Sequence, residues 1–146
     1  MPDDLASSDQ YIKNQESAEK YISRFRKKTL GHYINGARTP TEGAKTFENI
    51  SPISGKILNE VALGTAEDID AASKAAKKAF PEWRDMTSSD RRKILHKIAD
   101  LIVARADEIA LTECVDTGQA FRFMSKAAIR GAENYRFFAD KILEAN

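Results

Sequence analysis

The sequence predicts a chain that is mostly α-helical and that carries a short antiparallel β meander in its first half. Over most of its length, apolar residues recur at steps of three and four, which is the spacing of one helix face. Between residues 31 and 64 this spacing gives way to short apolar runs separated by glycine and proline. These two patterns define the fold class and the order of the elements.

The first predicted helix begins near Asp9, is capped by Ser7 or Ser8, and has Lys27 and Lys28 in its last turn. Its apolar stripe indicates a helix that docks on the rest of the chain. A helix that binds a partner or a membrane surface is the alternative, although the mixed charges of its polar face argue against a membrane.

Three strands are predicted next. Residues 32–37 enter a turn at Asn35-Gly36, residues 46–50 follow, and residues 56–63 come after a turn at Ser54-Gly55. A meander of so few strands has exposed edges and is marginal by itself.

The helices then resume. Thr65 and Asp68 form a capping box, Pro81 ends or bends the helix that follows it, and Trp83 packs back as a core residue. Residues 87–90 open the next helix.

That helix breaks near residues 106–107 and restarts, and its second part ends at Gly118, which can adopt the left-handed conformation. The final helix is amphipathic, and at Gly131 we expect a neighbouring helix or a ligand wall to approach closely. Its predicted apolar face consists of Met124, Ala128, Gly131, Tyr135, Phe138 and Ile142.

Composition excludes several classes of function. The chain has 146 residues, of which 42% are hydrophobic and 31% charged, and its net charge of +1 favours neither nucleic acid nor an anionic membrane as a partner. His32 and His96 are far apart and show no zinc-ligand spacing. The chain begins without the apolar run of a signal peptide, and no segment approaches ~18 consecutive apolar residues. With one cysteine, which fits a reducing compartment, these features predict a cytoplasmic protein.

The residues that could carry catalysis are missing. Cys114 has Glu113 and Asp116 as neighbours, which raise a thiol pKa, and no histidine or helix N-terminus is placed to lower it, so Cys114 is not predicted to be a nucleophile. No glycine-rich cofactor-binding segment follows a strand. We therefore predict no catalytic residue and no cofactor bound by this chain alone.

Three stretches together resemble the N-terminal part of the aldehyde dehydrogenase family. They are the strand and turn at residues 33–36, the Ser-Pro-x-x-Gly turn at residues 51–55, and Asp116-Thr117-Gly118 followed by the helix over residues 128–141. Within the family, the chain is most similar to the branch that acts on muconate-type semialdehydes such as 5-carboxymethyl-2-hydroxymuconate semialdehyde. The resemblance covers residues 31–145, whereas the helix before them is an extension that many members lack.

This resemblance implies an α/β parent fold. Residues 1–30 would be an N-terminal helical extension, and residues 31–146 an incomplete N-terminal part of the cofactor-binding domain. The complete enzyme would be a homo-oligomer that uses NAD or NADP to oxidise a small-molecule aldehyde bearing a carboxylate. The family's catalytic Cys, Glu and Asn motifs lie beyond this stretch, so the chain alone is predicted to be inactive.

The resemblance also implies two sites. Arg130 would grip the substrate carboxylate, which a guanidinium can bind in bidentate geometry; a surface arginine paired with Asn134 or Glu133 is the alternative. Asp116 would help hold a structural monovalent cation, together with backbone carbonyls around Asn49 and Ile50; an aspartate that binds local N–H groups at a helix end is the alternative.

A second class of function stays open. The chain could be a non-catalytic helical interaction module that binds a partner through the 8–28 helix or through the face of Tyr135 and Phe138. Folding in isolation discriminates the two, because a fragment leaves apolar surface uncovered whereas a module melts cooperatively.

Overall fold

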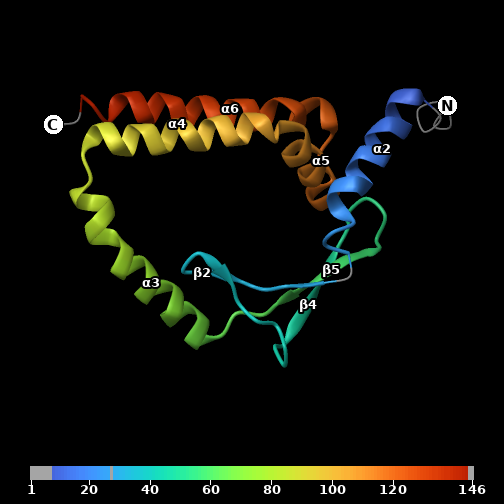
Figure 1. The fold of residues 1–146 in the computed structure, drawn as a ribbon. Coiled ribbons are helices and arrows are strands. Elements are labelled where there is room, and N and C mark those ends of the chain that lie inside the picture. Colours follow the sequence, from blue (N-terminus) through green and yellow to red (C-terminus); the bar gives the residue numbers. More distant parts are fainter. Residues whose placement is uncertain (1–7, 27, 145–146) are drawn as a thin grey trace.

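The computed structural model describes residues 8–26 and 28–144, so Ser7 and Lys27 lie outside the described residues. The chain forms an open ring (Figure 1). The helices α4 and α6 run side by side along one edge, α5 and α2 stand at one end of them, and α3 returns from the other end to the strands.

The first described helix, α2, spans Asp9–Ile22. Ser8 is its N-cap, and the Ser8 hydroxyl accepts a hydrogen bond from the backbone N–H of Tyr11, which confirms the predicted start. The predicted end is wrong, because the helix stops at Ile22 and leaves Lys28 outside it. The side chain of Ile22 is buried, and a tight turn from Ile22 to Phe25 redirects the chain toward the strands.

The strands form two small sheets. In the first sheet, β4 (Thr46–Ile50) pairs antiparallel with β5 (Ile57–Ala62), and β1 (Thr29–Leu30) pairs with the other edge of β5 in parallel. In the second, β2 (Tyr33–Ile34) and β3 (Ala37–Arg38) form a hairpin.

The hairpin turn confirms the prediction from Asn35-Gly36, since both residues have positive φ, 54° and 79°. The mostly helical fold with short antiparallel strands is confirmed as well. The sequence did not reveal β1 and β3, because two-residue strands are too short to show a period.

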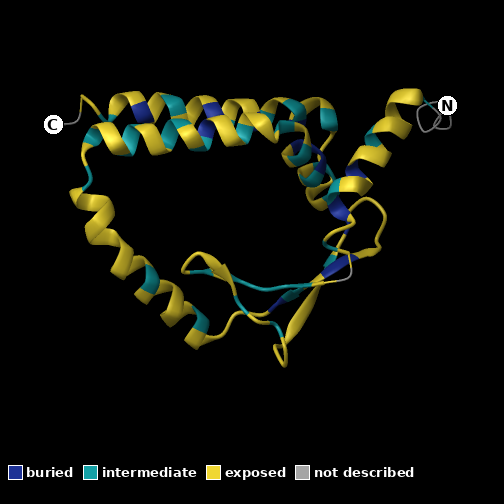
Figure 2. Cartoon of the chain, in the orientation of Figure 1, coloured by how far each residue is buried: buried dark blue, intermediate teal, exposed yellow. Residues whose placement is uncertain are grey.

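The helix α3 spans Ala66–Asp85 and begins with the predicted capping box, in which Thr65 and Asp68 exchange hydrogen bonds. Pro81 lies inside the helix and does not end it. Within the described part of the chain, no residue of α3 is buried, and Trp83 is 40% exposed, so the prediction that Trp83 belongs to the core is wrong. Figure 2 shows α3 as one side of the ring, exposed or half-buried along its length.

The remaining helices are α4 (Ser88–Ala104), α5 (Ala106–Thr117) and α6 (Phe121–Lys141), with the break at Arg105 as expected. Small side chains allow α4 and α6 to approach closely, because Ala99, Ala132 and Ala139 are fully enclosed. Ion pairs connect the same two helices: Arg136 with Asp100 at 2.7 Å, and both Arg92 and His96 with Asp140.

The buried face of α6 differs from the predicted one. Met124 and Ala128 are buried as expected, but the face continues through the alanines named above, and Tyr135 and Phe138 are exposed. A methyl group at Gly131 would meet no described atom within 4 Å, so the expected close neighbour at Gly131 is not among the described residues.

The helix α2 and the turn after it dock on α5 through a small apolar cluster and an ion-pair group. Ala18 and Ile22 of α2 pack with Leu111 of α5. Next to them, the carboxylate of Glu108 accepts hydrogen bonds from Arg105 and from Arg24, which follows α2, and these lower the pKa of Glu108 from 4.5 to about 2.

The exposed surface is large for a chain of this mass. It measures 11044 Å², whereas a compact protein of 16.3 kDa exposes about 7,500 Å² by the usual scaling of area with mass. No helix of the described residues is long and apolar enough to cross a membrane.

The Glu108 group generates a stability prediction. Because the folded-state pKa of Glu108 lies below its unfolded value, its stabilisation is present above pH 4.5 and is lost as the pH falls toward 2. At pH 7, Glu108→Gln is expected to weaken the docking of α2 by about 1 kcal/mol, so that the α2 amides exchange their hydrogens about fivefold faster.

The matched control is Asp107→Asn. Asp107 carries the same charge in the same first turn of α5, and it makes no ion pair within residues 8–26 and 28–144. Equal acceleration in both variants would show that the helix dipole, and not the arginine contacts, accounts for the effect.

Candidate functional site

The structure brings Asp116 and Asn49 together from opposite halves of the chain. Asp116 lies in the last turn of α5, and Asn49 lies near the end of β4. The side-chain amide of Asn49 donates a 2.8 Å hydrogen bond to a carboxylate oxygen of Asp116. Asp116 therefore bonds to a different element, β4. The local backbone is bonded by Thr117 instead: its hydroxyl donates to the carbonyl of Glu113 and accepts from the N–H of Gln119.

The close approach of two turns makes this contact possible. Gly118 ends α5 with φ 75°, and a Cβ built on it would lie 3.1 Å from Cγ of Pro52 in the turn after β4. That turn is held by buried Ser51, whose backbone pairs with Gly55 and Lys56 and whose hydroxyl accepts from the N–H groups of the next residues. A side chain at position 118 would therefore press against Pro52.

A β-bulge adjoins the contact. The pairing of β4 with β5 shifts between Asn49, which faces Asn59, and Ile50, which faces Ile57. Asn59 is buried, and its side-chain oxygen has no hydrogen-bond partner among the described residues. The side chain of Ile50 is a hydrocarbon, so Ile50 can offer a cation only its backbone carbonyl.

The oxygen atoms at this junction suit a singly charged cation better than a transition metal. No group of three or more His, Cys, Asp or Glu side chains that could hold a metal occurs within the described ranges. One carboxylate with neutral amide and carbonyl oxygens is a hard-oxygen donor set of low total charge. The residues present therefore fit a monovalent ion.

Arg130 stands apart on α6. Its side chain is exposed and makes no hydrogen bond or ion pair with any residue that the structure describes, including Asn134 and Glu133. Its guanidinium is accordingly available to a ligand.

Cys114 lies half-buried in α5, and its thiol pKa is raised, first by burial and then by the charge of Glu113. The expected direction of this shift is confirmed, with burial as the larger cause. A thiol with a raised pKa has little thiolate at neutral pH, which disfavours a nucleophilic role.

The two histidines pair with different carboxylates. His96 and Arg92 contact Asp140 between α4 and α6, and they lower the Asp140 pKa. His32 lies 3.7 Å from Asp68, whose pKa is lowered mainly by its hydrogen bonds with Thr65. Each pair joins two elements, so both have a structural role.

The start of α3 does not suit a dinucleotide. In the turn from β5 to α3, the carboxylate of Asp68 already accepts the N–H of Thr65, and Glu67 adds a second negative charge to the first turn of the helix. A pyrophosphate needs free N–H groups and no negative charge at such a helix start.

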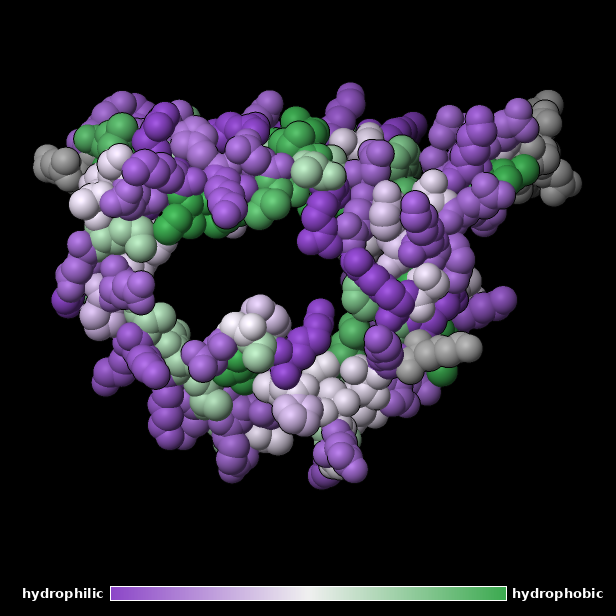
Figure 3. Space-filling model, viewed as in Figure 1, coloured by the Kyte–Doolittle hydropathy of each residue, from purple (hydrophilic) through white to green (hydrophobic). Residues whose placement is uncertain are grey.

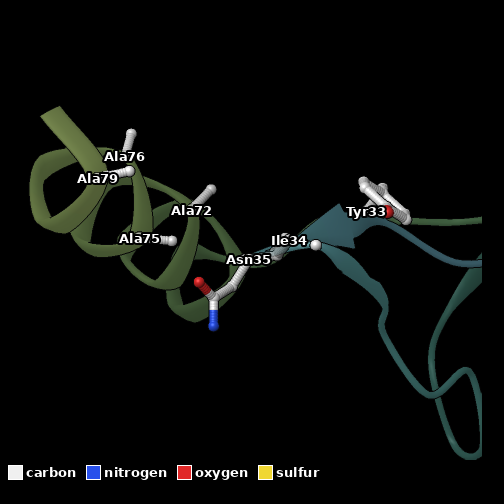
Figure 4. A pocket seen from close by; sticks show the side chains of 8 residues that line it. Tyr33, Ile34, Asn35, Ala72, Ala75, Ala76 and Ala79 are labelled. Carbon is white, nitrogen blue, oxygen red and sulfur yellow. The ribbon is translucent and has the colours of Figure 1, made fainter. Parts of the chain in front are cut away.

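A pocket that the sequence did not indicate lies between the β2–β3 hairpin and α3 (Figure 4). Its volume is about 370 Å³, and its walls are residues 33–36 and four alanines of α3. The labelled side chains include the carboxamide of Asn35 but no titratable group except the Tyr33 phenol. The alanine spacing in α3 was the one available signal, but it also occurs on ordinary packing faces.

The chain belongs to the aldehyde dehydrogenase family, whose model matches residues 39–146. Over 115 residues it is 40% identical to the 2-hydroxymuconic semialdehyde dehydrogenase of Pseudomonas sp. (strain CF600), an alignment that covers 77% of this chain and 24% of that protein. The 2-aminomuconic semialdehyde dehydrogenase of Danio rerio is 39% identical over 115 residues, with 78% and 23% covered.

Solved structures agree. HpcC from Thermus thermophilus matches with a TM-score of 0.82 and 35% identity, covering 87% of this chain and 25% of that one. The NAD+ complex of aldehyde dehydrogenase from Bacillus cereus matches with a TM-score of 0.74 and 33% identity, covering 85% and 25%. The chain thus spans about a quarter of the length of the relatives that it matches, at their N-terminal part.

The fit at Gly118 generates a second stability prediction. Gly118→Ala is expected to destabilise the protein by about 2 kcal/mol. Alanine is strained in the left-handed backbone conformation of residue 118, and its methyl group would press against Pro52. Gly43→Ala is the control, since Gly43 has the same φ of 75° and no described atom within 4 Å of a Cβ.

The measurement is the change in unfolding free energy for each variant. The control is expected to cost about 1 kcal/mol from backbone conformation alone. Equal losses in the two variants would mean that the approach of Pro52 contributes nothing.

Proposed function

We propose that this chain is the N-terminal part of an NAD(P)-dependent aldehyde dehydrogenase that oxidises a carboxylate-bearing, muconate-type semialdehyde to the acid. The family membership over residues 39–146 carries the proposal, together with the identity to two muconic semialdehyde dehydrogenases. We further propose that the complete enzyme is a cytoplasmic homo-oligomer, with which a single cysteine is compatible.

The open shape supports the idea that further protein covers this chain. The exposed area exceeds that of a compact protein by about half. Figure 3 shows a gap through the centre, with apolar side chains at its rim on the α4–α6 edge and on the strands. No large side chain of the described residues is fully enclosed. In a stable enzyme, these apolar surfaces need to be covered by a further part of the protein, the covering part.

The catalytic residues and the cofactor site lie in that covering part. This chain has no activated thiol, because burial and Glu113 raise the pKa of Cys114. It also has no free helix start for a dinucleotide at the β5–α3 turn. The NAD+ complex of the Bacillus cereus relative supports a nicotinamide cofactor for the complete enzyme, bound outside this chain.

Arg130 is our candidate for recognising the substrate carboxylate. Its guanidinium is exposed and carries no competing ion pair with the described residues. A planar guanidinium can donate two parallel hydrogen bonds to one carboxylate. Muconic semialdehydes, which the names of two relatives specify, carry such a group.

Asp116, with backbone carbonyls of Asn49 and Ile50, is our candidate for a structural monovalent-cation site. A cation here would neutralise Asp116 and strengthen the junction between α5 and β4, which already depends on one 2.8 Å hydrogen bond.

The alternative is a non-catalytic helical interaction module. Tyr135 and Phe138 favour it, since both are exposed on α6 where a partner could bind.

The isolated 146-residue chain decides between these functions. If it is a fragment, it is expected to show no hydride transfer from any aldehyde to NAD or NADP, to bind a hydrophobic dye and to unfold without a sharp transition. Calorimetry and dye fluorescence measure this. Cooperative melting as a defined monomer or dimer would support the module instead.

Arg130 can be tested in the complete enzyme. Arg130→Ala is expected to lower kcat/KM for a carboxylate-bearing semialdehyde by about 10- to 150-fold, equivalent to about 1.5–3 kcal/mol for a hydrogen bond to a charged group, and to leave a neutral aldehyde nearly unchanged. Arg130→Lys is expected to recover only part of the loss, because an ammonium group cannot form the bidentate pair.

Lys126→Ala is the matched control, since Lys126 is an exposed cation one turn earlier on α6. If Arg130→Ala lowered kcat/KM equally for charged and neutral aldehydes, Arg130 would not be the carboxylate-binding residue.

A further inference from the structure

Asn59 is a buried polar residue with an unsatisfied atom. It lies in β5, the central strand of its sheet, and is 8% exposed. Its side-chain oxygen is shielded from solvent and accepts no hydrogen bond from the described residues. Burying an amide oxygen without a partner is costly, so such an atom requires a donor or a cation.

The strand register places Asn59 beside the Asp116 site. Asn59 faces Asn49 directly across the antiparallel pair of β5 and β4. Residues that oppose each other in this way project from the same face of a sheet, with Cβ atoms about 5 Å apart. Asn49 is in turn hydrogen-bonded to Asp116, so Asn59 is connected to that carboxylate through the residue that it faces.

The side-chain oxygen of Asn59 is an acceptor, so either a hydrogen-bond donor or a cation would satisfy it. The carboxylate of Asp116, which is hydrogen-bonded to the facing Asn49, favours a positive charge near this junction.

We propose that the side-chain oxygen of Asn59 is a neutral ligand of a monovalent cation held at Asp116. This inference rests on the cation site proposed above and adds to it a ligand from the centre of the sheet. One carboxylate balances one positive charge, and the amide oxygen supplies a hard donor without adding charge. Asn59 would also connect cation binding to the sheet, because β5 pairs with both β1 and β4.

The test uses the complete enzyme and thermal unfolding in potassium chloride, with choline chloride at equal ionic strength as the reference. The wild type is expected to show a rise in Tm with a half-saturating K+ concentration. Asn59→Leu is expected to raise that concentration about tenfold or more, the scale of losing one interaction with a charged group. Asn59→Asp, which adds a negative charge, is expected to lower it several-fold.

Asp116→Asn separates the two proposals. If it abolishes the K+ response while Asn59→Leu responds like the wild type, the cation site stands and the role of Asn59 is overturned. If the wild type does not respond to K+, or Asp116→Asn does not change the response, the cation site itself is wrong and the inference falls with it.

A structural readout covers the case in which Asn59→Leu does not fold. Crystals of the wild-type enzyme soaked in a thallium(I) salt are expected to show an anomalous peak at coordination distance from the Asn59 oxygen and from Asp116. An ordered water at the Asn59 oxygen, with thallium elsewhere, would overturn the proposal.

Discussion

The packing of α5 against three different elements holds the two sides of this structure together. Leu111 of α5 packs against α2, and Asp116 in the last turn of α5 is hydrogen-bonded to Asn49 of β4. The chain then reverses at Gly118 into α6. Because α5 is the element that joins the α4–α6 layer to the sheet at this end of the ring, its two ends set where the sheet can lie.

Ion pairs add only modest stability to the contacts between these elements. Glu108, Asp140 and Asp100 each receive an arginine from another part of the chain, and the pKa values of Glu108 and Asp140 fall accordingly. Apart from Glu108, whose side chain is 13% exposed, the partners are substantially exposed, so their ion pairs contribute little. The apolar contacts are also modest, since alanines make up most of the enclosed residues. Both observations agree with a body whose main packing partner lies outside this chain.

The residues of this chain indicate which steps of the proposed reaction it can support and which require the rest of the enzyme. It offers an available guanidinium at Arg130 and a hard-oxygen junction around Asp116, both of which bind small charged groups without chemical change. Its single cysteine, Cys114, has a raised pKa, and the start of α3 is occupied by its own capping box. These residues can therefore contribute substrate recognition and structural support, and in the proposed enzyme the catalytic residues lie outside this chain.

Local chemistry in the sequence determined the caps, the turns and the helix stop. Ser8, the Thr65–Asp68 box, the Asn35-Gly36 turn and Gly118 all occupy the expected conformations, because each depends on residues within a few positions of one another. Only the tertiary structure decided that Trp83, Tyr135 and Phe138 are exposed, that β1 joins the sheet in parallel, and that Asn59 is buried opposite Asn49. The physical reason is distance along the chain: burial and register are set by contacts between residues tens of positions apart, and periodicity in one segment carries no information about which other segment will cover it.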